Sequence, residues 1–165
     1  MLAAKPVEQP AGRTHDVEAA VQVQDVDSGQ IHKFKQGTFT AALDGKAWDR
    51  TFVNVWNLAI SPDGDRLAAE VRLNLYDYTI AVDGVVWDKT FACVWEPIFN
   101  PNTQAVVAPV RIGGQWTLAE NGNILWDRRF VQAWKQVYSP DGEKLAAVVA
   151  PKYGLWTVAV DGMPW

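Results

Sequence analysis

Residues 78–97 read YTIAVDGVVWDKTFACVWEP, and this stretch decides the fold because its pattern recurs along the chain. It holds an aromatic-Thr pair, an Asp-Gly dipeptide, a Trp-Asp pair, a Phe and a Val-Trp pair. Residues 156–165 read WTVAVDGMPW and repeat its first half. Self-similarity with a period of about 20–50 residues is typical of solenoids, propellers and other repeat arrays. The repeat is therefore the feature from which the architecture can be predicted.

The period of this repeat is 39 residues. Trp48, Trp87, Trp126 and Trp165 stand at that interval, and a second Trp series, an Asp series and a Phe series keep it. The third repeat has Asn-Gly in place of Asp-Gly and one residue inserted before its Trp. The recurring positions that we predict to stabilise the repeats or to contact a partner are Trp48, Trp56, Trp87, Trp95, Trp126, Trp134, Trp165, Asp49, Asp88 and Asp127.

Each period predicts four short strands. In the second repeat we expect them over 55–60, 66–72, 78–83 and 85–91. The first two are joined by residues 61–64, Ser-Pro-Asp-Gly, in which Pro fixes φ, Asp caps its own backbone and Gly accepts a positive φ. Asp83-Gly84 is a hairpin signal. No sustained 3.6-residue period indicates helix. Four short antiparallel strands in about 40 residues are typical of a propeller blade.

The sequence thus predicts an all-β, β-propeller-like array of about four four-stranded antiparallel blades. Their expected ranges are 17–52, 53–91, 92–130 and 131–165, after a flexible N-terminal lead-in over 1–16. Both end blades are expected to be incomplete, since the first lacks an initial strand and the chain stops where the last outer strand begins. An unpaired edge is an aggregation liability. We therefore expect further blades or a second copy, in a homodimer, to complete the ring.

The second Trp series (Trp56, Trp95 and Trp134) lies in the predicted innermost strands. Because a blade is covered on both faces, we expect these rings to fill the space between sheets, with small alanines such as Ala68 and Ala69 accepting them. The alternative is a ring of aromatic side chains at a channel mouth, able to hold a sugar, a quinone or a loop of a partner.

The Asp series (Asp49, Asp88 and Asp127) follows the first Trp series. We expect each carboxylate to accept hydrogen bonds from backbone N–H groups in a tight turn. The alternative is an acidic ring that binds a metal. Metal binding needs oxygen donors that converge on one point, whereas the symmetry of the blades would spread these groups around the ring, so no metal site is predicted.

Composition excludes several function classes. The net charge is −4 and the single Cys rules out a disulfide framework, and this acidic balance argues against a nucleic-acid binder. Cys93 stands where other repeats have Asn54 and Gln132, which indicates a tolerant position rather than a nucleophile. With two His and no CxxCH motif, we expect no cofactor and no enzymatic activity. No apolar run approaches the ~18 residues of a membrane span, and the first residues lack a signal peptide's apolar stretch.

The Ser-Pro-Asp-Gly turns followed by Leu-Ala-Ala resemble the WD40-like repeats of TolB-type propellers, although the Gly-His dipeptide of standard WD40 repeats is absent. The fuller signature of residues 78–97 and 156–165 is similar to the TmcD family. These are the tryptophan-rich subunits of the transmembrane cytochrome c complex of sulfate-reducing bacteria. The resemblance covers about residues 17–165, and members of that family are considerably longer.

This resemblance implies a non-catalytic protein-interaction or scaffold subunit of an electron-transfer complex. It would lie on the cytoplasmic side, peripheral to the inner membrane and not inserted in it, and would carry no cofactor of its own. Its partners would be the protein subunits of a membrane-bound cytochrome complex, which carry haem and iron–sulfur centres. No catalytic residues of the family can be transferred. The alternative is a small-ligand-binding or hydrolytic propeller that uses the central channel.

Overall fold

The computed structural model describes residues 37–165, and in this part of the chain all regular structure is β. Fifteen strands form four antiparallel sheets. Across the described residues, no helix has the length and apolar character needed to cross a membrane. The strands are β1 (Ala42–Leu43), β2 (Lys46–Ala47), β3 (Asn54–Ile60), β4 (Leu67–Arg72), β5 (Tyr78–Val82), β6 (Val85–Val86), β7 (Cys93–Val94), β8 (Ile98–Phe99), β9 (Val106–Ile112), β10 (Gln115–Glu120), β11 (Asn123–Ile124), β12 (Gln132–Tyr138), β13 (Leu145–Lys152), β14 (Leu155–Val160) and β15 (Met163–Pro164).

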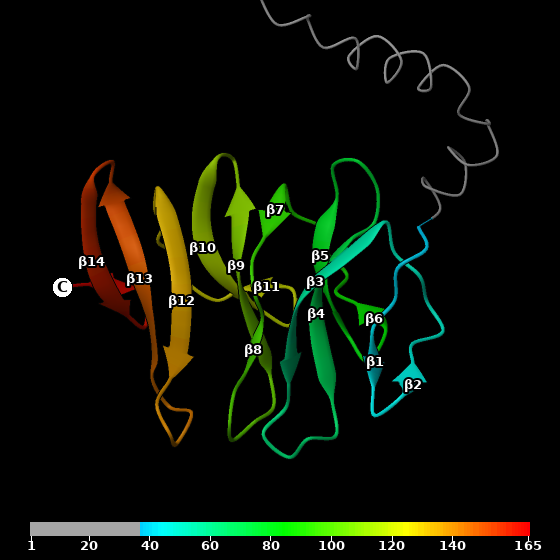
Figure 1. Cartoon of the computed structure of the whole chain (residues 1–165). Helices are drawn as coiled ribbons and strands as arrows, with labels where there is room; N and C mark the ends of the chain where they lie inside the picture. The colour runs from blue at the N-terminus through cyan, green and yellow to red at the C-terminus, as the bar shows by residue number, and fades with distance from the viewer. Residues whose placement is uncertain (1–36) are drawn as a thin grey trace, which may run out of the picture. The chain divides into compact units, whose positions relative to one another are not determined.

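The sheets stand side by side in chain order (Figure 1), from the β1–β2 hairpin at one end to the β12–β15 sheet at the other. We call them the first to fourth sheets. The second and fourth each have four strands in sequential order, and the third has the same order with its innermost strand divided into β7 and β8. This is the propeller-like arrangement that the repeat predicts.

The turns follow the predicted chemistry. Before β6, Asp83 and Gly84 both have positive φ, 52° and 81°, as a two-residue type I′ hairpin turn requires. Asp161 and Gly162 repeat this before β15, at 49° and 81°. In the Ser61 turn, the Ser61 hydroxyl donates to Asp63 at 2.5 Å and accepts from the Arg66 backbone N–H at 2.9 Å. Local sequence therefore fixes these turns in the second and fourth sheets.

Each innermost strand of the second to fourth sheets contains one extra residue. The pairing of β3 with β4 shifts between Trp56 and Ala59, and that of β12 with β13 shifts between Trp134 and Val137. In the third sheet, Pro97 separates β7 from β8, because proline has no N–H for the ladder. A bulge changes the direction of the side chains beside it from the regular in-and-out alternation of a strand. Trp56 and Trp134 lie directly before these bulges.

The core lies between sheets, in one cluster per junction. Between the second and third sheets, Trp87, Phe91 and Ile80 pack with Val110 and Ala119. A matching cluster around Trp126 and Phe130 joins the third sheet to the fourth, and a smaller one around Phe52 joins the first to the second. The sheets are therefore held together by apolar side chains facing one another across each junction.

The outer strands differ from the sequence prediction. The last sheet does have an outer strand, since Met163 pairs with Val160. Outer strands are shorter than expected throughout: β6 covers two residues, and Phe91 then makes an isolated bridge to Tyr78. The predicted lead-in over 1–16 and the strand expected at 18–23 lie outside the described residues.

Candidate interaction surface

The first Trp series joins each sheet to the next. A Cβ placed on Gly84 would lie 3.2 Å from Trp48, one on Gly122 3.2 Å from Trp87, and one on Gly162 3.2 Å from Trp126. The indole of one outer strand thus packs on the hairpin turn of the following sheet, where only glycine leaves room for it. Trp87 and Trp126 are 8% and 4% exposed. These Trp residues are structural contacts between sheets.

Trp165, the fourth member of this series, is 87% exposed. It lies after β15 in the last sheet, and no described sheet follows it. Its backbone nevertheless makes the hydrogen bond typical of the series: the Thr157 hydroxyl donates to the Trp165 carbonyl oxygen at 3.0 Å. The same bond joins Thr117 to the Trp126 carbonyl at 2.7 Å. Trp165 therefore has the same local backbone bond as Trp126, but its ring does not pack on the hairpin glycine of another described sheet.

The second Trp series fills the space between sheets only in part, and the prediction that these rings are packed there is wrong in that they are half-exposed. Trp56 and Trp95 are 36% and 40% exposed, and Trp134 is half-buried. The innermost strand has a neighbour on only one edge, and the bulge after Trp56 and Trp134 turns the chain there. Each ring lies beside an aromatic side chain of its own sheet, such as Trp56 stacked on Tyr78 with centroids 6.3 Å apart, and Trp95 and Trp134 also contact each other across a junction.

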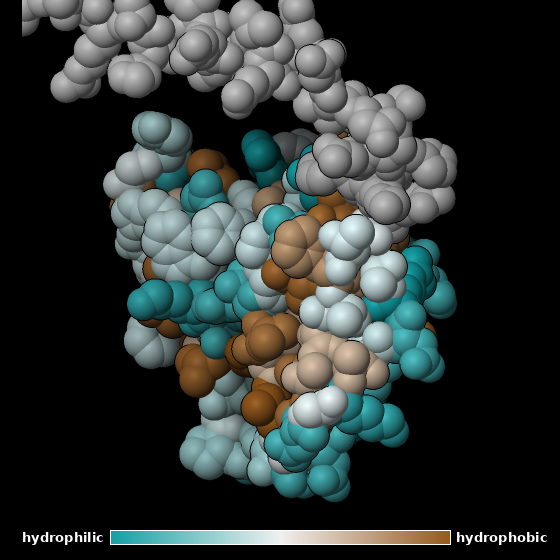
Figure 2. All heavy atoms as spheres, turned by 45° about the vertical axis from the view of Figure 1, so that its right-hand side comes forward, coloured by the Kyte–Doolittle hydropathy of each residue, from teal (hydrophilic) through white to brown (hydrophobic). Residues whose placement is uncertain are grey.

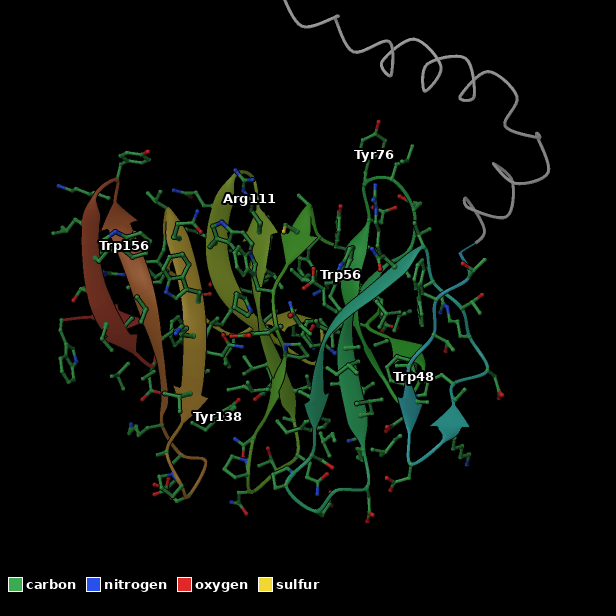
Figure 3. All side chains as sticks on the ribbon, viewed as in Figure 1. Trp48, Trp56, Tyr76, Arg111, Tyr138 and Trp156 are labelled. Carbon is green, nitrogen blue, oxygen red and sulfur yellow. The ribbon has the colours of Figure 1, made fainter. Side chains whose placement is uncertain are left out.

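Four indoles in contact form an aromatic row, defined as Trp116, Trp95, Trp134 and Trp156. Trp116 is buried, the other three are partly exposed, and Trp134 stacks on Trp156. Successive ring centroids are 5.5, 6.4 and 4.8 Å apart. The step from Trp95 to Trp134 crosses from the third sheet to the fourth. Figure 3 places Trp156 and Trp56 in the half of the sheets that also carries Arg111, and Tyr138 in the opposite half. Half-exposed indoles of this kind can stack on a ligand or a partner.

The Asp series does not accept the backbone hydrogen bonds expected of it. Asp49, Asp88 and Asp127 are exposed, and no hydrogen bond to their side chains is present among residues 37–165. The same part of the chain contains no group of three His, Cys, Asp or Glu side chains able to hold a metal ion. Each Asp follows the outer strand of a different sheet, so the repeat separates these carboxylates.

Another series, made of Asp83, Asn121 and Asp161, joins each hairpin turn to the second strand of its sheet. Asp83 accepts the Leu67 backbone N–H at 2.9 Å, Asn121 accepts that of Val106 at 3.0 Å, and Asp161 accepts that of Leu145 at 3.1 Å. Asp83 also forms an ion pair with Arg66 at 2.8 Å, and Asp161 forms one with Lys144 at 2.9 Å. The Asp-Gly repeat in the sequence predicts the turn, but it does not predict the hydrogen bond that the Asp side chain accepts from the backbone of the second strand.

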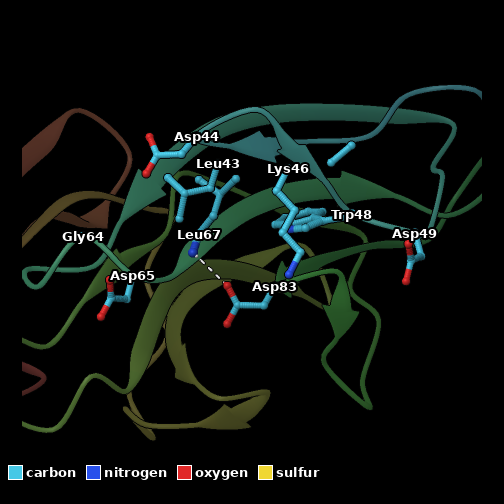
Figure 4. A pocket seen from close by; sticks show the side chains of 10 residues that line it. Leu43, Asp44, Lys46, Trp48, Asp49, Gly64, Asp65, Leu67 and Asp83 are labelled. Carbon is cyan, nitrogen blue, oxygen red and sulfur yellow. Dashed lines mark hydrogen bonds between the residues drawn. The ribbon is translucent and has the colours of Figure 1, made fainter.

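A cleft lies between the first hairpin and the second sheet (Figure 4), with Trp48, Asp49, Asp65 and Asp83 among its lining residues and a volume of about 620 Å³. Similar clefts of about 390 and 510 Å³ lie beside Trp87 and Trp126 at the next two junctions. Because the cleft recurs wherever one sheet meets the next, it is a consequence of the packing and not a specialised site.

The polar groups beside the innermost strands include Glu70 and the Cys93 thiol. Glu70 is partly buried, which raises its pKa, and it accepts a hydrogen bond from the Asn57 amide at 2.8 Å. Burial, with the charge of Glu70, raises the pKa of the Cys93 thiol. A thiol in this state is a weaker nucleophile at neutral pH.

Comparisons with known proteins support the fold alone. No family model and no curated protein matches the chain. A crystal structure of TolB from Acinetobacter baumannii matches with a TM-score of 0.52 and 20% sequence identity. The match covers 67% of this chain but 30% of that one, so the chain spans less than a third of TolB. The chain is therefore similar to a TolB-type β-propeller in fold.

Proposed function

We propose that this protein is a non-catalytic interaction subunit that docks onto a larger assembly through exposed aromatic side chains. The observation that carries the proposal is the half-exposure of Trp56 and Trp95 in sheets whose first-series Trp residues, Trp87 and Trp126, are buried. Exposed Trp is enriched where proteins bind one another, since its ring combines a large apolar area with one polar N–H. The strict repeat supplies a rigid support for such rings.

The assembly that fits the sequence resemblance is a transmembrane cytochrome c complex of sulfate-reducing bacteria. In that setting the protein is a cofactor-free accessory subunit on the cytoplasmic side, peripheral to the inner membrane. The haem and iron–sulfur centres belong to its partners. The resemblance of residues 78–97 and 156–165 to the TmcD family supports this assignment.

The test is co-purification. Tagged protein added to detergent-solubilised membranes of a sulfate-reducing bacterium is expected to retain haem-bearing subunits in a fixed ratio, measured by haem absorbance and mass spectrometry. Trp56→Ala and Trp95→Ala are expected to lower this retention at least tenfold. Tyr153→Ala, which removes a 95% exposed ring from the β13–β14 hairpin, is the matched control. Absence of haem proteins from the retained fraction would contradict the proposal.

A second candidate function is the binding of a small ligand on the aromatic row. The stacking of Trp134 on Trp156, with centroids 4.8 Å apart and planes 20° from parallel, favours it because it presents a flat apolar surface. A thermal-shift screen with sugars, short peptides and divalent cations tests this function. A saturable shift that Trp134→Ala abolishes would support it, and no shift with any compound would argue against it.

A further inference from the structure

At the junction of the second and third sheets, an arginine lies between an aromatic ring and a carboxylate. The guanidinium carbon of Arg66 lies over the Phe99 ring of the third sheet, 5.9 Å from the ring centroid. The Nε atom of the same side chain donates to Asp83, which follows β5, at 2.8 Å. A guanidinium is attracted both to the face of an aromatic ring and to a carboxylate. At this junction the chain itself supplies all three groups.

One repeat later, where the third sheet meets the fourth, the same arrangement is incomplete. Tyr138, which stands 39 residues after Phe99, keeps the aromatic ring. Ala105 stands at the same interval after Arg66, so the third sheet supplies no guanidinium at this place. Among residues 37–165, no cationic side chain lies over the Tyr138 ring.

The third sheet nevertheless carries a carboxylate at this place. Its hairpin has Asn121 at the Asp83 position, but the residue before it is Glu120, where the second sheet has Val82. The Tyr138 hydroxyl donates to Glu120 at 3.1 Å, so the carboxylate lies beside the ring. Within the described part of the chain, Glu120 forms no ion pair with a basic side chain. A half-buried carboxylate without a cationic partner is unfavourable, because burial removes part of its hydration.

A cavity of about 270 Å³ lies beside this carboxylate. Glu120 and Tyr138 line it together with Leu125, which is 42% exposed, so the cavity is open to solvent. Its volume is several times the ~30 Å³ that one water molecule occupies in the liquid. In the equivalent cavity beside Trp87, the Arg66 side chain is part of the lining. The packing of sheets makes a cavity at both junctions, but the one beside Glu120 has no arginine of its own sheet in it.

We propose that this cavity, which we call the guanidinium site, binds the side chain of an arginine that a partner protein supplies. The guanidinium lies over the Tyr138 ring and donates to the Glu120 carboxylate. Arg66 makes the corresponding pair of contacts within the chain, so the repeat accommodates this geometry. Arginine fits the site better than lysine does, because its flat and weakly hydrated head group stacks on a ring and still pairs with a carboxylate.

The guanidinium site is separate from the exposed Trp residues of the proposed function. Tyr138 lies in the half of the sheets opposite to Trp56 and Trp156 (Figure 3). Figure 2, which brings the end with the first hairpin forward, shows hydrophilic side chains along the lower edge of the array, the edge to which Tyr138 is close. A contact on this side therefore depends on polar and charged groups, which contribute more to specificity than to affinity.

The test uses the full chain and short peptides as probes. The first probe is the tripeptide Gly-Arg-Gly with both ends blocked, and the second has citrulline in place of arginine, which keeps the shape and removes the charge. Chemical-shift titration of the isotope-labelled protein follows the backbone amide signals of Glu120 and Tyr138. We expect saturable shifts with the arginine peptide and none with the citrulline peptide. Equal shifts with both peptides, or none with either, would overturn the proposal.

Variants of the carboxylate and the ring sharpen this test. Glu120→Gln keeps an acceptor for the Tyr138 hydroxyl and removes the charge, so the arginine peptide should bind about tenfold more weakly, as expected for the loss of one charge-assisted hydrogen bond. Glu96→Gln removes an exposed carboxylate between β7 and β8 and is the matched control. Tyr138→Phe keeps the ring and should retain binding. Equal affinities of the Glu120 and Glu96 variants would contradict the proposal.

Ala105→Arg tests the site from within the chain. It gives the third sheet the side chain that the second sheet has at Arg66, so its guanidinium should occupy the site, block the arginine peptide and raise the urea concentration at the midpoint of unfolding. Ala105→Gln adds a long uncharged side chain and should not raise this midpoint. In a chain that also carries Glu120→Gln, the rise should be absent. An equal rise with and without the Glu120 carboxylate would overturn the proposal.

A last comparison separates a partner's arginine from a small molecule. Free arginine carries the same guanidinium, so it is titrated beside the blocked tripeptide. Binding of free arginine without binding of the tripeptide would assign the site to a small molecule and overturn the partner assignment. Retention of haem proteins through Trp56 and Trp95 does not enter any of these measurements, so their failure is distinct from that of the proposed function.

Discussion

The strands β4 and β13 begin with the same three residues, Leu-Ala-Ala, yet they are buried differently. Leu67, Ala68 and Ala69 are all buried in β4, where sheets lie on both sides. In β13, Leu145 and Ala147 are buried but Ala146 between them is not, because its side chain lies on the open face of the last sheet. An identical tripeptide therefore has two environments, and the neighbouring sheet decides which one it has.

The largest expected effect contrasts Trp126 with Trp165. Trp126→Ala removes a buried ring from the junction of the third and fourth sheets and should lower the free energy of unfolding by about 3–5 kcal/mol. Trp165→Ala should change it by less than about 0.5 kcal/mol in the single chain, since the ring is exposed. Urea unfolding at low protein concentration measures both. Equal losses would mean that Trp165 is covered in solution.

The hairpin glycines offer a second contrast. Gly45→Ala should lower the free energy of unfolding by about 1–2 kcal/mol because of the positive φ alone. Gly84→Ala has the same backbone strain and also places a Cβ within 3.2 Å of Trp48. Its free energy of unfolding should therefore fall by about 1 kcal/mol more than that of Gly45→Ala, or further. The difference between the two unfolding free energies isolates the contact between sheets, and a difference near zero would argue that the indole simply moves aside.

A polar contact across a junction should matter less. The Tyr138 hydroxyl donates to Glu120 at 3.1 Å, joining the fourth sheet to the third. Burial, followed by the charge of Glu120, raises the pKa of Tyr138, so the phenol stays protonated as a donor. Tyr138→Phe should lower the free energy of unfolding by about 1 kcal/mol. Tyr153→Phe, at an exposed hairpin, should leave it unchanged.

The smallest expected effect is on the stability of the protein at low pH. Hydrogen bonds from Ser61 and then from Gln104 of the following sheet lower the pKa of Asp63 from 3.8 to about 2. Asp141, in the matching turn of the last sheet, has its pKa lowered by the equivalent Ser139 and by a backbone N–H, without a bond from a following sheet. Since the folded pKa of Asp63 lies below the unfolded one, its stabilising effect is complete above about pH 4 and is lost as the pH falls toward 2. The melting temperature of Asp63→Asn should therefore fall less than that of the wild type over this range. A parallel fall in both proteins would contradict this.

The sequence was most informative where local chemistry acts alone. The Ser-Pro-Asp-Gly and Asp-Gly turns lie where they are predicted, because proline, Asp side chains and glycine restrict the backbone without help from distant residues. It was least informative about side chains whose environment depends on another sheet. Trp56 and Trp87 recur with equal regularity, but only Trp87 is buried, and Asp49 and Asp83 recur equally, but only Asp83 bonds the neighbouring strand.

A period of 39 residues, with its turns, by itself determined that the described chain is a row of antiparallel sheets of one kind, since repetition of local signals repeats the local structure. Which Trp residues are buried was decided only by the tertiary structure. Burial depends on what lies across a junction, and a repeating sequence is the same whether or not another sheet lies there. Trp126 and Trp165 have the same place in the repeat, and only the packing of sheets distinguishes them.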